Sequence, residues 1–150
     1  MSKNCLICSR INSIKNSTNP YFIIELKTGY VVFADHQFFK GYVLFLCKQH
    51  KTELHQLDTE YKKNFLIEMS LVAETVFKAF KPEKLNYELL GNKDSHLHWH
   101  IIPRYRYDPH PQRAIWAINQ SLVNSDKYCP SKIELKKMRG KFIKALKTLQ

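Results

Sequence analysis

Short apolar stretches separated by turn-forming residues dominate the first third of the chain. Tyr21–Leu26 and Tyr30–Ala34 are two of them, split by three residues that end in Gly29, and Tyr42–Cys47 is a third. Apolar runs of this length predict β-strands, and the first two predict a hairpin. Residues 9–20 are polar and predict a loop.

The apolar period then changes to three or four residues. Over Asp58–Phe80 it predicts a helix that buries one face, with Asp58 or Thr59 as its N-cap. A second helix is predicted after Ser131, which forms a capping-box pattern with Glu134. The apolar positions of these two helices are Tyr61, Phe65, Met69, Val72, Val76 and Phe80, and then Leu135, Met138, Phe142, Leu146 and Leu149.

Two further apolar stretches, Leu85–Leu90 and Leu97–Ile102, predict strands between the helices. The sum is an α+β domain with a five-stranded, mostly antiparallel sheet and two main helices. A chain of 150 residues with 44% hydrophobic content has the size and composition of one domain. We therefore expect a single domain over residues 1–150, with an N-terminal loop segment over 1–20 and a C-terminal loop and helix over 106–150.

Three histidines occupy alternate positions in the last predicted strand. His96, His98 and His100 are separated by single apolar residues. Because successive side chains of a strand point to opposite faces, the imidazoles share one face and the apolar residues pack on the core. Imidazole can act as a nucleophile, as an acid–base group or as a metal ligand near neutral pH. Same-face neighbours lie about 7 Å apart along a strand, so all three would reach one ion only with difficulty.

A Cys-x-x-Cys pair lies near the N-terminus. Cys5 and Cys8 suit a redox pair, half of a zinc site or a chance occurrence. A zinc site needs two more ligands, and His50 and His96 are available at strand ends. Two cysteines and two histidines form an ordinary tetrahedral zinc set.

The chain is basic, with a formal net charge of +11 and a sequence pI of about 9.5. Such a charge suits either a solvated surface or a polyanionic partner, namely nucleic acid, a nucleotide or an acidic membrane. The sequence has no apolar run of transmembrane length, and its first ten residues lack the apolar core of a signal peptide. We expect a cytoplasmic protein without a membrane partner.

The histidine stretch and its surroundings resemble the histidine-triad (HIT) superfamily. His-Leu-His-Trp-His-Ile-Ile-Pro-Arg, residues 96–104, is similar to the family signature, in which three histidines alternate with apolar residues. Gly41–His50 is similar to the family strand that ends in Pro-Lys-x-His, and Val31–Asp35 to the strand before it. The resemblance extends over roughly residues 5–105 and implies a HIT-like fold, which family members commonly assemble into homodimers.

The resemblance also implies nucleotidyl transfer at a small-molecule nucleotide substrate. His98 matches the family nucleophile that attacks the α-phosphate, His96 would orient it, and His100 would contact the phosphate or the leaving side. The implied enzyme hydrolyses a dinucleoside polyphosphate, such as diadenosine tetraphosphate, or a phosphoramidate through a nucleotidyl-histidine. Some branches of the family carry structural zinc, and their ligand set matches Cys5, Cys8, His50 and His96.

The substrate-binding positions match the family less closely. Asp35 matches a position that binds ribose hydroxyls, whereas Asn92 and Ser95 would replace a Gly-Gln-Ser or Gly-Gln-Thr element that holds phosphate oxygens. Tyr42 stands where most members have histidine. The arginines after the triad, Arg104 among them, are candidates for distal phosphates or are solvated charges.

The alternative is a protein of another class. A zinc-stabilised module could bind nucleotides or nucleic acid through its positive charge without turning them over. That module would bind DNA or RNA with a strong salt dependence, and replacing His98 would leave the binding unchanged.

Overall fold

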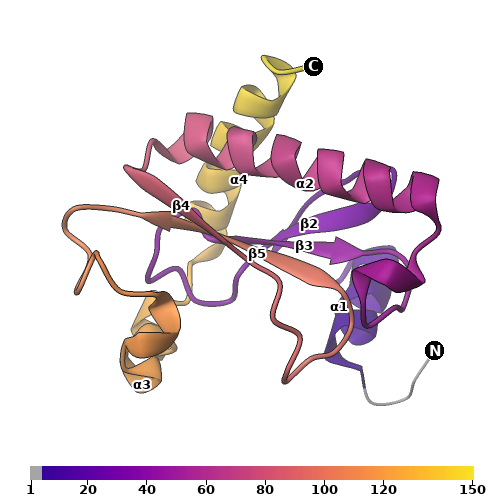
Figure 1. Ribbon diagram of the computed structural model, residues 1–150. Coiled ribbons are helices and arrows are strands. Elements are labelled where there is room, and N and C mark those ends of the chain that lie inside the picture. Colours follow the sequence, from indigo (N-terminus) through magenta and orange to yellow (C-terminus); the bar gives the residue numbers. More distant parts are fainter. Residues whose placement is uncertain (1–4) are drawn as a thin grey trace.

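A five-stranded antiparallel sheet forms the centre of the protein. The computed structural model describes residues 5–150, and its strands are arranged in the order β1-β2-β3-β5-β4 (Figure 1). All four neighbouring pairs run antiparallel, which confirms the predicted α+β class. The strands are β1 (Phe22–Glu25), β2 (Gly29–Phe33), β3 (Val43–Cys47), β4 (Lys84–Glu88) and β5 (His98–Arg104).

The helices divide between the two faces of the sheet. The two long helices, α2 (Thr59–Phe80) and α4 (Lys132–Lys147), pack against each other above the sheet in Figure 1. The shorter helices α1 (Leu6–Lys15) and α3 (Gln120–Val123) lie below it. Within residues 5–150, no helix has the length and apolarity needed to cross a membrane. Short 3-10 helices occupy Leu54–Gln56, Ile115–Ala117 and Asp126–Tyr128.

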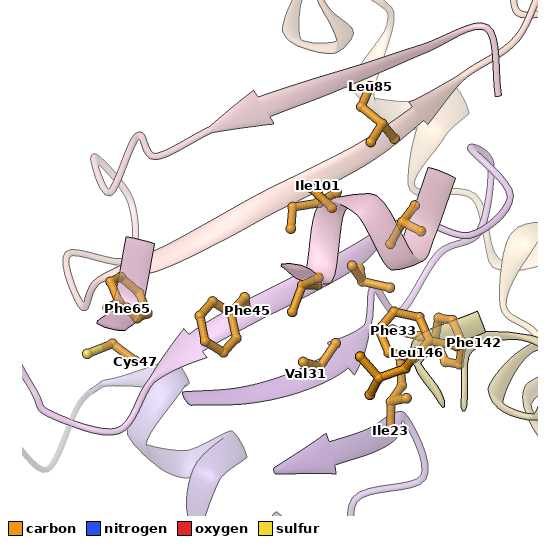
Figure 2. Close-up of a cluster of buried hydrophobic side chains, with 14 of the residues drawn as sticks. Ile23, Val31, Phe33, Phe45, Cys47, Phe65, Leu85, Ile101, Phe142 and Leu146 are labelled. Atoms are coloured by element: carbon orange, nitrogen blue, oxygen red, sulfur yellow. The ribbon is translucent and has the colours of Figure 1, made fainter. Parts of the chain in front are cut away.

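The alternation of side chains along β3 supplies both faces with a core. Phe45 points toward α2, where it stacks on Phe65 with ring centroids 5.1 Å apart. Phe33, Ile101 and Phe142 belong to the same cluster, in which they are fully buried (Figure 2). The intervening residues of β2 and β3 belong to a second cluster, on the α1 side. Because the sheet is covered on both faces, its central strands are fixed in position at the site described below.

Both predicted helix starts are present. Asp58 caps α2 by accepting a hydrogen bond from the backbone N–H of Tyr61. Ser131 and Glu134 form the reciprocal capping box at the start of α4. Helix α2 ends at Phe80, and its C-cap residue Lys81 adopts a left-handed conformation one residue before Pro82.

The predicted N-terminal loop is wrong, because residues 6–15 form α1. Ile7, Ile11 and Ile14 recur at helical spacing and are buried against the sheet. The residues between the isoleucines are mostly polar and face solvent. The high overall polarity of the segment therefore hides the helical spacing of its apolar residues. The last strand begins at His98, so His96 lies just before it rather than within it.

Candidate active site and metal centre

His98 and His100 lie side by side on the face of the sheet that α1 covers. In the register of β3 and β5, Leu46 pairs with His98 and Leu44 with His100. Both leucines belong to the cluster on the α1 side, so the two imidazoles face away from α2 and α4. This shared face is the arrangement that the alternating sequence predicts.

A directional chain of hydrogen bonds connects the histidines. His98 Nδ1 lies 2.6 Å from the backbone oxygen of His96, which can only accept, so Nδ1 carries the proton. His98 Nε2 is then left with a lone pair, and it lies 3.0 Å from His100 Nε2. His100 must therefore donate from Nε2, and its Nδ1 accepts from the Tyr42 hydroxyl at 2.5 Å. The chain runs from Tyr42 through His100 to the Nε2 atom of His98.

The environment keeps His100 and Tyr42 neutral. Burial, with a smaller contribution from His98, lowers the pKa of His100 from its ordinary 6.5 to about 4. Burial also raises the pKa of Tyr42, so its hydroxyl keeps the proton that it donates. The unfolded chain would protonate His100 near 6.5, so this group makes the folded state less stable as the pH falls from 6.5 toward 4.

The four residues of the predicted zinc set converge beside the triad. One ligand atom each of Cys5, Cys8, His50 and His96 lies within 4.8 Å of every other. Cys8 Sγ lies 3.3 Å from His50 Nδ1 and 3.4 Å from His96 Nδ1, and the two Nδ1 atoms are 3.2 Å apart. Tetrahedral zinc with N and S ligands at about 2.0 and 2.3 Å would space them about 3.3–3.8 Å apart. The donor set and its spacing therefore fit a zinc ion.

The tautomer of His96 fits the same role. Its Nε2 lies 2.8 Å from the backbone oxygen of Cys47, so Nε2 carries the proton and Nδ1 offers its lone pair to the cluster. Metal-binding histidines are commonly oriented by such a second hydrogen bond. The backbone oxygen of His96 accepts from His98, so one residue links the metal centre to the candidate nucleophile.

A model of the HIT domain matches residues 16–107, which is more than half of the chain. The chain belongs to the HIT family. Membership supports nucleotide binding and a nucleotide hydrolase or transferase activity in general, as the sequence motif implied. No curated protein matches the sequence significantly.

Solved structures of HIT proteins share the fold at low sequence identity. A histidine triad protein from Bradyrhizobium japonicum is 23% identical, with a TM-score of 0.72 over 83% of this chain and 89% of that one. A hypothetical histidine triad nucleotide-binding protein from Sulfolobus tokodaii is 18% identical, with a TM-score of 0.72 over 95% and 93% of the two chains. A zinc-bound histidine triad family protein from Mycobacterium smegmatis is 16% identical, with a TM-score of 0.68 and complete coverage of both.

The predicted ribose-binding residue has a partner that the sequence did not indicate. Both oxygens of Asp35 accept hydrogen bonds from the Arg10 guanidinium, at 2.7 and 2.5 Å. This fork-shaped pair fixes the carboxylate at the end of β2 and fastens α1 to the sheet. The carboxylate has further lone pairs for a ligand, while Arg10 places a positive charge beside it.

The two predicted phosphate-binding residues are placed differently. Ser95 lines a small cavity of about 40 Å³ together with His96 and His98. Asn92 is exposed and does not line that cavity. Gly91 has a positive φ of 71°, which forms the turn that precedes both residues.

A segment after β5 covers the far side of His100. The indole ring of Trp116 stands edge-on to His100 with centroids 5.7 Å apart, and its Nε1 donates to Glu88. Arg104 anchors this segment, because it is buried against Asp108 at 3.0 Å and donates to the backbone oxygen of Arg113. Arg104 is thus engaged within the protein rather than free for a phosphate.

Proposed function

We propose that this HIT protein hydrolyses a dinucleoside polyphosphate, such as diadenosine tetraphosphate, or a related nucleotide at its α-phosphate. The observation that supports the proposal is the hydrogen-bond chain that leaves an unprotonated Nε2 on His98. Fixed on a strand between two other histidines, that atom is prepared to attack without first losing a proton.

The first step forms a nucleotidyl-histidine. The Nε2 lone pair of His98 attacks the α-phosphorus, a P–N bond forms, and the bond from phosphorus to the bridging oxygen breaks. The leaving nucleoside polyphosphate departs with the electrons of that bond. Without substrate, the Nε2–H of His100 donates to His98. With substrate bound, this N–H would donate instead to a phosphate oxygen or to the leaving oxygen, where it offsets the negative charge.

The second step returns the free enzyme. Water attacks the phosphorus, the P–N bond breaks, and its electrons return to His98 Nε2. The water proton passes to solvent, and a nucleoside monophosphate is released. The backbone oxygen of His96 accepts from Nδ1 throughout, so it stabilises the positive charge that the imidazole carries in the intermediate.

The experiment that tests this function supplies candidate substrates to the pure protein. Diadenosine tetraphosphate, adenosine phosphoramidate and ATP are incubated separately, and the products are resolved by chromatography. Release of AMP supports α-phosphate hydrolysis, and the fastest substrate indicates whether the leaving group is a polyphosphate or an amine. Absence of AMP from all three would contradict the proposal.

A second candidate is a nucleotide-binding HIT protein without turnover. His98 is only 5% exposed. Trp116 lies against His100, which is next to His98 on the same face of the strand. A substrate would therefore need the space that the segment around Trp116 occupies. Calorimetry measures whether AMP binds, and together with the turnover assay above it distinguishes the two functions. Binding without turnover of any nucleotide above would favour this second candidate.

Tyr42 takes part in this proposal as a positioning residue. Replacing it with phenylalanine removes the donor to His100 Nδ1, so the imidazole no longer prefers the tautomer that donates from Nε2. We expect kcat to fall about tenfold, with little change in KM. A tenfold fall corresponds to an increase of roughly 1.4 kcal/mol in the activation free energy, which is the typical contribution of one hydrogen bond. NMR of the His100 ring nitrogens should show a mixture of tautomers in Tyr42→Phe and only the Nε2–H form in the wild type. If the His100 tautomer is the same in Tyr42→Phe and the wild type, Tyr42 does not position His100 and contributes only packing.

We also propose that the protein forms a homodimer through the β4 edge of the sheet and the outer face of α2. Strand β4 ends the sheet and has no partner on its outer side among residues 5–150. Ile67, Phe77 and Tyr87 expose 66%, 50% and 48% of their surface on these two elements. A second copy would cover these apolar groups and extend the sheet.

Charge introduced into this surface should separate the dimer. Light scattering should give a dimer mass for the wild type and a monomer mass for the double variant Phe77→Glu, Tyr87→Glu, because two buried carboxylates would be unpaired. Ile133→Glu is the control, since Ile133 is 82% exposed on α4, outside the two elements that form this surface. A monomeric wild type would contradict the prediction.

A further inference from the structure

A basic cleft lies at the other end of β5 from the candidate nucleophile. His98 begins β5, and the cleft begins at Tyr105, just after the last residue of the strand. Seven residues of extended chain span roughly 23 Å, so the cleft is separate from the triad. It has a volume of about 650 Å³ and lies where the end of α2 meets the C-terminal half of α4.

Five lysines surround this cleft. One of them, Lys40, forms an ion pair with Glu134 at 3.4 Å, while the other four form none with any acidic group of residues 5–150. Like charges gathered around one concavity repel each other, and a polyanion would relieve that repulsion. The lysines are Lys40, Lys78, Lys81, Lys141 and Lys144.

Two stacked tyrosine rings form part of the cleft wall. Tyr105 is held in place because its hydroxyl donates to the backbone oxygen of Lys40 at 2.7 Å. Tyr107 stacks on it with centroids 5.0 Å apart and ring planes inclined by 8°. Tyr107 is 77% exposed, so it presents an aromatic surface to solvent beside the lysines. An aromatic platform next to cationic groups is the arrangement that binds an unpaired base and its phosphates.

The charge continues beyond the cleft along α4. Seven of the 16 residues of this helix are Lys or Arg, and Glu134 is its one acidic residue. A single nucleotide would use the cleft alone, whereas a chain of phosphates would also use the rest of the helix. We propose that the cleft binds single-stranded nucleic acid, with one base stacked on Tyr107 and the phosphates following Lys141 and Lys144. The concave shape favours this ligand over a flat anionic membrane, which would not reach Tyr105.

The test measures binding of a fluorescein-labelled oligo(dT) of about 12 nucleotides, a length within the usual range for such sites. Anisotropy is recorded with the full chain at several salt concentrations. Lys141→Glu, Lys144→Glu should weaken binding at least about tenfold and make the salt slope shallower by roughly 0.7 for each phosphate that the variant no longer neutralises. Tyr107→Ala should weaken it by about tenfold, whereas Tyr107→Phe should bind as the wild type does.

A matched charge-reversal variant distinguishes a specific binding site from non-specific attraction by the net positive charge. Lys15 and Lys27 are exposed, lie outside α4 and do not line the cleft, so reversing both changes the net charge equally and should weaken binding much less. His98→Ala should bind the oligonucleotide normally, so the cleft can be tested even if hydrolysis is never observed. Three results would each overturn the proposal: no binding, equal weakening in both charge-reversal variants, or binding to phosphatidylserine vesicles in place of the oligonucleotide.

Discussion

Replacing His98 with alanine is expected to abolish turnover of any nucleotide that the wild type hydrolyses, by a factor of at least about 10⁴. No other imidazole can take over the attack. His100 Nε2 carries a proton in the hydrogen-bond chain, and His96 directs its Nδ1 toward the cysteines. Intact mass spectrometry after a brief incubation with substrate should show an acid-labile adenylyl adduct on the wild type and none on His98→Ala.

A matched histidine variant controls for the loss of an imidazole as such. His55 is exposed on the short helix before α2 and belongs to neither the triad nor the cysteine cluster. His55→Ala should keep the activity and the adduct. Residual turnover by His98→Ala above about 1% of the wild-type rate would show that water attacks directly, and His98 would then be an orienting group.

The features that could be predicted are those whose signal is local. The alternation of His98 and His100 fixes a shared face, because the period of a strand is two whatever it packs against. The Asp58 cap and the Ser131–Glu134 box depend on residues three apart, and both are present. The convergence of Cys5 and His96 needed the family resemblance, since 91 residues separate them.

The features that were missed depend on distant contacts. Tyr42 and His100 are 58 positions apart, and nothing in the sequence near Tyr42 shows that its hydroxyl reaches His100. Arg10 meets Asp35 only because residues 6–15 form α1, which the polar residues of that segment concealed. Three isoleucines at helical spacing were the signal that could have indicated α1, and Arg10 would then have faced the end of β2.

Loss of the proposed zinc ion is expected to destabilise the whole domain. The cluster joins the start of α1 to the end of β3 and the residue before β5, two segments that are already hydrogen-bonded to each other. At free zinc about a thousandfold above its dissociation constant, binding would contribute roughly 4 kcal/mol, or about 10 °C in Tm for a domain of this size. Cys8→Ser should lower the zinc content from one ion per chain to near zero, and Tm should fall by about that amount.

Cys129 provides the matched control, because it is an exposed thiol outside the four-residue cluster. Cys129→Ser should keep its zinc and its Tm. Cys129 does lie near His36 and Asp126 in a second group of potential ligands, so loss of zinc in this variant would assign the metal there instead.

Thiol alkylation supplies a readout that does not depend on activity. Cys129 should react with iodoacetamide at once, whereas Cys5 and Cys8 should react only after a chelator removes the metal. If Cys5 and Cys8 react just as fast before chelation, the four side chains form a hydrogen-bonded cluster without an ion. His96 would then be oriented by Cys47 and by the hydrogen bonds of the cluster, and no metal would be linked to His98.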